Sequence, residues 1–149
     1  MALLKRSDFL FRVFLIVFFW SNFLNAETLY DYKIIRVIDG DTVEIEANFL
    51  PAPLKPSLKL RIYGIDTPEK KSRAKCDLEA ELSKKATAFT QKVINESISK
   101  KIKIRKWDKY GGRVLGDIIL DGKSLELLLL NEGLAKPYDG GKKLSWCNT

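Results

Sequence analysis

The feature of this sequence that most constrains its fold is the order of its periodic segments. Five short runs are rich in β-branched residues or alternate between apolar and polar residues, at residues 32–37, 42–47, 58–65, 102–107 and 114–120. Such runs are typical of half-buried strands. A long helical pattern spans residues 77–97, and a short one spans residues 124–132. Three strands, a helix, two strands and a helix predict an α+β fold, a small five-stranded β-barrel with attached helices.

Local signals place the turns and the helix ends. Asp39-Gly40 is a tight-turn signal between the first two strands. In the long helix one face carries an apolar series at spacings of four, three and four, made of Leu82, Ala86, Phe89 and Val93. Asp77 is its predicted N-cap. The short helix is expected to begin after Ser124 and to end at Gly133. Its four consecutive leucines make it apolar nearly all round, which predicts a buried helix.

The N-terminus has the layout of a secretory signal peptide. A basic start is followed by an apolar run over residues 13–19 that continues to Leu24, and Ala26 offers a small residue for cleavage. This pattern predicts a cleaved segment of residues 1–26 and a mature domain of residues 27–149, exported to the periplasm or the outside. The alternative is an uncleaved membrane anchor, although the uninterrupted run is shorter than the ~20 residues that a span needs.

Charge and cysteine content fit an exported protein that binds a polyanion. The formal net charge is +7, and the mature chain would keep an excess of basic residues, which favours encounter with nucleic acid. Cys76 and Cys147 are the two cysteines of the chain. In an oxidising compartment they can form a disulfide, which would stabilise the fold by about 4 kcal/mol. The alternative is two separate thiols, because the sequence does not show that they are close.

The chain has no histidine, and its two cysteines are expected to be paired, so a metal site would have to use oxygen ligands. Asp41 and Asp66 both lie at predicted strand ends, and Thr67 offers its carbonyl beside them. Oxygen-only sites favour Ca²⁺, Mg²⁺ or Mn²⁺ over zinc or copper. Taken singly, each aspartate has a structural explanation, Asp41 as a turn residue and Asp66 as a cap of its own Thr-Pro turn.

Other charged residues suit the hydrolysis of a phosphodiester. Arg61 and Arg113 can neutralise phosphoryl oxygens, because a guanidinium group matches phosphate geometry. Glu69 is a candidate base, three residues after Asp66. The alternatives are a solvated barrel face for Arg61, a surface turn for Arg113 and a surface glutamate for Glu69.

Three motifs in order carry a resemblance to a known family. They are residues 37–43 (VIDGDTV), Arg61 followed by residues 65–69 (IDTPE), and residues 108–113 (DKYGGR). Together with the helix between the second and third motifs, they resemble the staphylococcal-nuclease-like (thermonuclease) family over residues 32–138.

The resemblance implies an OB-fold barrel and a secreted, Ca²⁺-dependent nuclease that cleaves DNA and RNA with little sequence specificity. It implies in-line attack by water that leaves 3′-phosphates, and one Ca²⁺ per chain. We expect a monomer without an obligate protein partner and without stable membrane association after signal cleavage.

The resemblance also implies roles for single residues. Asp41 and Asp66 would be metal ligands together with the Thr67 carbonyl. Glu69 would bind or activate the attacking water, and Arg61 and Arg113 would hold the phosphate. Contacts with neighbouring parts of the substrate would come from Lys109, Tyr110 and Tyr138.

The chain departs from the family in three places. It has a proline-rich insertion at residues 51–56, an extra glycine before Arg113, and a short C-terminus in which a full third helix is not expected. The disulfide would take over part of that helix's stabilising role. Two other functions stay open, a non-catalytic OB-fold module that binds nucleic acid and a membrane-tethered interaction module. The complete set of acidic and arginine residues argues against the first.

Overall fold

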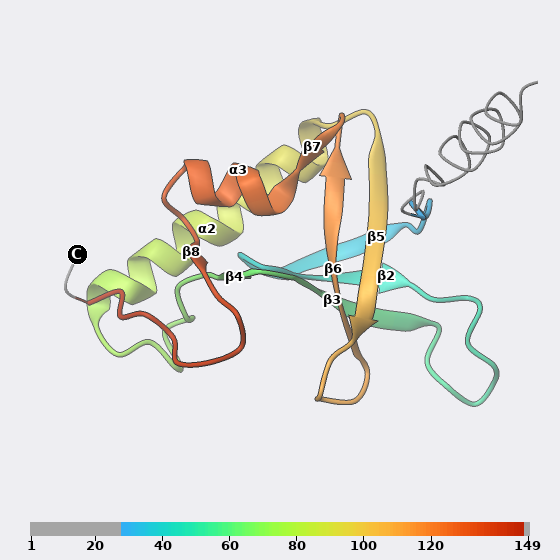
Figure 1. The fold of residues 1–149 in the computed structure, drawn as a ribbon, viewed down its shortest axis with the longest axis horizontal. Helices are drawn as coiled ribbons and strands as arrows, with labels where there is room; N and C mark the ends of the chain where they lie inside the picture. Colours follow the sequence, from blue (N-terminus) through green and yellow to red (C-terminus); the bar gives the residue numbers. More distant parts are fainter. Residues whose placement is uncertain (1–27, 148–149) are drawn as a thin grey trace, which may run out of the picture.

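The computed structural model describes residues 28–147, and the predicted signal segment lies outside them. The helices lie beside a strongly twisted sheet (Figure 1). The elements, in chain order, are β1 (Ile34–Asp39), β2 (Thr42–Glu46), β3 (Ser57–Ile62), β4 (Ile65–Asp66), α2 (Asp77–Glu96), β5 (Lys100–Trp107), β6 (Arg113–Leu120), β7 (Lys123–Ser124), α3 (Leu125–Asn131) and β8 (Lys136–Pro137). All five predicted strands and both helices are confirmed. The third strand run divides into β3 and β4, because Gly64 turns the chain with a φ of 86°.

The main sheet is mixed, with the strand order β1-β2-β3-β6-β5. Its neighbours are antiparallel except for β3 and β6, which are parallel. A separate pair joins β4 to β8. One isolated bridge links Tyr30, ahead of β1, to Ile102 of β5. No closed barrel is found within residues 28–147, so the α+β class is confirmed and the predicted barrel is supported only as a mixed sheet with two helices.

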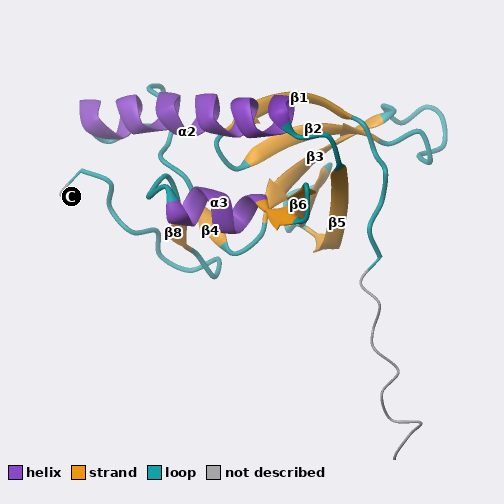
Figure 2. Ribbon diagram, turned by 90° about the horizontal axis from the view of Figure 1, so that it is seen from above, coloured by secondary structure: helices purple, strands orange, loops and turns teal. Residues whose placement is uncertain are grey.

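Alternating side chains of the central strands form the core. Inward positions are buried while their neighbours on β2 and β3 face outward, as the period of two requires. The largest fully buried side chains include Ile45, Leu60, Ile62, Ile102, Ile118, Leu125 and Leu129. Helix α2 contacts β1, α3 contacts β6, and the two helices contact each other, as Figure 2 shows from above. The opposite face of β3 and β6 carries Lys59, Arg61 and Arg113 together with Leu115.

The position of α2 is set by its contact with the β1–β2 turn. A Cβ added to Gly40 would lie 2.8 Å from the Cβ of Ala86, and the Thr90 hydroxyl donates to the Gly40 carbonyl at 2.7 Å. The buried face of α2 includes Ala86, Thr90 and Ile94, so Ala86 of the predicted apolar series is confirmed as buried. Phe89 and Val93 of that series are partly buried and pack against the core. The prediction that Asp77 is the N-cap was wrong, since Cys76 caps the helix and accepts from the Glu79 amide.

Helix α3 begins as predicted at the cap Ser124, whose hydroxyl accepts from the Leu127 amide at 3.3 Å. The prediction that this helix is buried is confirmed only in part. Leu125 and Leu129 are fully buried, but Leu127 is 57% exposed, because α3 lies at the edge of the domain and presents one side to the outside.

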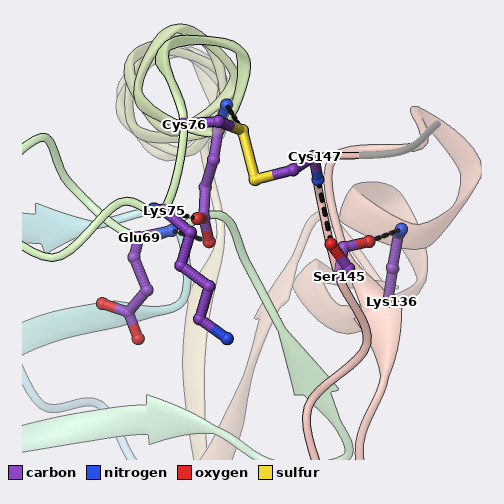
Figure 3. Close-up of a disulfide and its surroundings, with 7 residues drawn as sticks. Glu69, Lys75, Cys76, Lys136, Ser145 and Cys147 are labelled. Carbon is purple, nitrogen blue, oxygen red and sulfur yellow. Dashed lines mark hydrogen bonds between the residues drawn. A yellow bond between two sulfur atoms is a disulfide. The ribbon is translucent and has the colours of Figure 1, made fainter.

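The predicted disulfide between Cys76 and Cys147 is confirmed, and it closes a separation of 71 residues. Figure 3 shows that it ties the C-terminal segment to the start of α2. Trp146 beside it is buried, and the ammonium group of Lys136 lies 4.4 Å from its ring centroid. No third helix follows α3 up to residue 147, so these contacts hold the segment instead. Within the described part of the chain, no helix is long and apolar enough to cross a membrane.

Candidate active site

Arg61 joins the two predicted aspartate ligands. Its Nη1 donates to Asp41 Oδ1 and its Nη2 donates to Asp66 Oδ1, both at 3.0 Å. Arg61 lies on β3 opposite Thr42 of β2, while Asp41 precedes β2 and Asp66 ends β4. Sheet register therefore brings Asp41 next to Arg61 and Asp66, which lie about twenty residues further along the chain. Both aspartates are buried, with 2% and 4% of their surface exposed.

Asp41 is held on both carboxylate oxygens. Its Oδ1 also accepts from the Thr42 hydroxyl at 2.8 Å, and its Oδ2 accepts from the Thr67 amide at 3.1 Å. Burial raises the pKa of Asp41, against the lowering effect of the Arg61 charge, and the neighbouring Asp39 raises it further. Asp39 Oδ1 is itself buried and accepts no hydrogen bond from the described residues. The negative charge here is thus only partly compensated.

These residues fit a hard divalent cation in their chemistry. Every available ligand is an oxygen, and the unpaired Asp39 Oδ1 adds one more acceptor to the two buried aspartates. Within residues 28–147, however, no group of three or more acidic, cysteine or histidine side chains has the spacing of a metal centre. The Arg61 guanidinium instead satisfies the facing oxygens of Asp41 and Asp66.

Glu69 pairs with two basic side chains that the sequence did not single out. Lys143 Nζ lies 2.7 Å from Glu69 Oε1, and Arg73 Nε lies 3.0 Å from Glu69 Oε2. Lys143 also contacts Asp66 Oδ1 at 2.7 Å. Burial acts to raise the pKa of Glu69, but the hydrogen bond and charge of Lys143, with the charge of Arg73, outweigh it and lower the pKa. Glu69 is therefore firmly ionised at neutral pH.

Glu69 gives a prediction for stability against pH. A carboxylate whose pKa is lowered by folding stabilises the fold above its ordinary value of 4.5, and this contribution is lost as the pH falls through the folded-state pKa. At neutral pH, Glu69→Gln is expected to lower the free energy of unfolding by about 1 kcal/mol or less, because the pairs are partly exposed. Urea titrations of both proteins should converge at acid pH. A difference independent of pH would contradict this origin.

Arg113 lies on the same face of the sheet as Arg61. Arg113 is the first residue of β6 and lies opposite Lys59 of the parallel strand β3. Arg61 lies opposite Leu115, two residues after Arg113. The Arg113 guanidinium donates to Asp108 through Nε and Nη2. The extra glycine is accommodated by the turn, where Gly112 has a φ of 74° that side-chain-bearing residues rarely adopt. The doubled glycine therefore does not remove Arg113 from the site.

Both arginines and Glu69 line one open cleft of about 1030 Å³, whereas Asp41, Asp66 and Thr67 lie behind its wall. The predicted contact residues Lys109, Tyr110 and Tyr138 also line it. Tyr110 has the Lys109 ammonium 5.3 Å and the Arg113 guanidinium 5.2 Å from its ring centroid. Tyr138 lies beside Lys143.

Sequence reasoning missed two aromatic residues of this cleft. Tyr63 has the Arg105 guanidinium 4.9 Å from its ring centroid, and Trp107 is 59% exposed. Their signal in the sequence was position, since both follow the outward alternation of a predicted strand run, although the structure places Tyr63 in the turn between β3 and β4 and Trp107 at the end of β5. Basic groups interleaved with exposed aromatic rings suit a flexible polyanion whose bases can stack.

Comparison with known proteins gives a consistent result. Residues 59–144 match the family described as staphylococcal nuclease homologue, a match that begins after Asp41. Endonuclease YhcR of Bacillus subtilis (strain 168) is 30% identical over 120 residues, covering 76% of this chain and 9% of that protein. Thermonuclease of Staphylococcus hyicus is 32% identical over 107 residues, 70% of this chain and 57% of that protein.

A third relative, endonuclease YncB of B. subtilis (strain 168), is 31% identical over 117 residues, with 75% of this chain and 50% of that protein covered. The chain thus spans between about a tenth and just over half of the length of these relatives. More than half of its residues match the family itself. The chain therefore belongs to the staphylococcal nuclease family.

Proposed function

We propose that this protein is a metal-dependent nuclease that hydrolyses phosphodiester bonds of DNA and RNA with little sequence specificity. Family membership supports a nuclease and a nucleic-acid substrate. The observation that carries the proposal is Arg61, which joins two buried aspartates on one side and lines the open cleft on the other. A phosphate in the cleft would meet this guanidinium next to the acidic residues.

We assign one Ca²⁺ to the oxygens of Asp41 and Asp66 and to the Thr67 carbonyl. The bound ion would supply positive charge for the phosphoryl oxygens, which carry more negative charge as the reaction proceeds. Calcium is the ion typical of the family, and an oxygen-only donor set suits it.

In this proposal, Arg61 and Arg113 both bind the phosphate. Arg61 lies on β3 and Arg113 lies on β6, and these two strands are hydrogen-bonded to each other. The sheet therefore holds both guanidinium groups on a rigid surface. Such preorganised donors stabilise charge that develops in the transition state. Glu69 would orient the attacking water in line with the leaving 5′-oxygen, which leaves a 3′-phosphate.

Lys109, Tyr110 and Tyr138 would contact the substrate on either side of the cleaved bond. Lys109 supplies charge for a neighbouring phosphate, and the two exposed rings offer stacking surfaces. Asp108 holds Arg113 through its carboxylate, so the phosphate would have to recruit donors of Arg113 that this pair leaves available.

Export is part of the proposal. A disulfide persists in oxidising compartments, and the Cys76–Cys147 bond supports a periplasmic or extracellular location. A signal segment over residues 1–26 remains a prediction from the sequence.

The test is digestion of plasmid DNA and of RNA with Ca²⁺, with Mg²⁺ and with a chelator. We expect cleavage of both substrates with Ca²⁺, because the oxygen ligands need the ion to complete the site, and loss of cleavage when the chelator removes it. Unchanged cutting in the chelator would refute the metal assignment. Binding of nucleic acid without cutting under any condition would favour the non-catalytic module instead.

A further inference from the structure

The C-terminal segment crosses the candidate site between two fixed points. At one end, β8 pairs with β4, and the Tyr138 amide donates to the Gly64 carbonyl at 2.8 Å. At the other end, Trp146 is buried and Cys147 is bonded to Cys76. Residues 139–145 between these anchors are largely exposed. The path of these residues over the domain is therefore fixed by the two anchors at their ends, since the residues themselves are not buried.

Lys143 lies in the middle of this span and points its ammonium group at the acidic residues. Its Nζ is 2.7 Å from Asp66 Oδ1 and 2.7 Å from Glu69 Oε1. The neighbouring Lys142 is exposed. Two carboxylates three residues apart, one at the end of β4 and one in the loop after it, thus contact one cation that comes from a distant part of the chain.

The contact differs from an ordinary surface ion pair. The side chain of Asp66 is 5% exposed, while that of Lys143 is 37% exposed. A nearly buried carboxylate loses free energy of interaction if its partner leaves, because little water can reach it. Charge-assisted hydrogen bonds to such a carboxylate are therefore stronger than exposed ion pairs. Lys143 therefore provides charge that Asp66 would otherwise have to obtain from a metal ion or from Arg61 alone.

We propose that Lys143 is a built-in cation that occupies the acidic centre, and that it must leave Asp66 and Glu69 before a divalent cation binds there. This inference rests on the proposed function, since it assumes that Asp66 is a metal ligand. The same carboxylate oxygen cannot hold the ammonium group and a divalent ion closely at once, because the two cations repel each other. The disulfide-anchored segment would then set the affinity of the site for its metal.

The test is direct Ca²⁺ binding by isothermal titration calorimetry, without nucleic acid, on the full protein. Lys143→Gln removes the competing charge and is expected to tighten the dissociation constant for Ca²⁺ roughly tenfold. Lys142→Gln is the matched control, with the same change in net charge on the same segment, and its affinity should stay near that of the wild type.

A second variant releases the segment without changing its charge. Cys76→Ser combined with Cys147→Ser removes the disulfide and keeps a hydroxyl that can cap α2. Circular dichroism would first confirm that the variant is folded. We expect its affinity for Ca²⁺ to change in the same direction as in Lys143→Gln, because Lys143 is then no longer held over Asp66.

The outcomes separate this inference from the proposed function. Tighter binding in Lys143→Gln but not in Lys142→Gln supports the built-in cation. Equal and measurable binding of Ca²⁺ by the wild type, Lys143→Gln and Lys142→Gln overturns the built-in cation and leaves the proposed metal-dependent nuclease intact. If neither the wild type nor Lys143→Gln binds Ca²⁺, both the inference and the calcium assignment fall.

Discussion

Replacing Arg61 by glutamine is expected to lower kcat for DNA cleavage by about 10²- to 10³-fold, the range for removal of one preorganised transition-state donor. Glutamine keeps much of the length of the side chain but carries no charge. The ground-state phosphate has other basic partners in the cleft, including Lys109 and Lys59. KM should therefore change much less than kcat, because the charge of Arg61 is needed most when negative charge accumulates on the phosphoryl oxygens.

Steady-state kinetics on a defined oligonucleotide would measure both parameters. The control is Arg36→Gln, which removes an equal charge from an exposed arginine that pairs with Glu44 on the other side of the turn and is not part of the cleft. We expect its kcat to match that of the wild type. A variant of Arg61 with a raised KM and an unchanged kcat would instead assign this residue to substrate binding alone.

Gly116→Ala is expected to destabilise the fold by about 3 kcal/mol or more, through overpacking that neither strand can relieve. A Cβ at this position would lie 2.0 Å from the Lys103 carbonyl oxygen and 2.9 Å from Leu60 Cδ1. The Gly116 carbonyl also accepts from the Tyr63 amide at 2.7 Å. Because β5, β6 and the end of β3 meet at this residue, a shift of one strand would disturb the other two.

Thermal and urea unfolding would measure the effect, with an expected fall in Tm of roughly 10 °C or more. Gly111→Ala is the matched control, since a Cβ there would meet nothing within 4 Å and the residue has no positive φ. Its Tm should lie close to that of the wild type. Equal stability of the two variants would mean that β5 and β6 can move apart at Gly116 without lowering the free energy of unfolding.

The strands and helices could be predicted because their signals are local. Alternation and helical spacing depend on neighbours in the sequence, and so do the Asp39-Gly40 turn and the Ser124 cap. The buried face of α2 could be predicted only in part, because the burial of Thr90 beside Ala86 follows from the close approach of Gly40 to the helix. That approach joins segments more than forty residues apart, and no periodicity within the helix reveals it.

The site likewise has residues that a local motif predicted and residues that only the tertiary structure reveals. Arg61, Asp66 and Glu69 belong to one short motif, and in the structure Arg61 joins Asp41 to Asp66 while Glu69 and Arg113 line the same cleft as Arg61. Lys143 and Arg73 were missed because each appeared as one basic residue in an exposed basic stretch. Their partners depend on where the disulfide and the loop after β4 carry the chain, which is a tertiary property. The roles of these residues in catalysis stay predictions until the variants are measured.

The parallel pairing of β3 with β6 has a consequence for how this protein can diversify. The backbone positions of Arg61 and Arg113 are fixed relative to each other by a hydrogen-bonded ladder. Insertions in the turn at residues 108–112 or changes in the C-terminal segment would alter which nucleotides reach the cleft, yet they would leave the two arginine positions in place. Under the proposed function, substrate preference can therefore vary through the loops while the spacing of the two arginines is kept with the sheet.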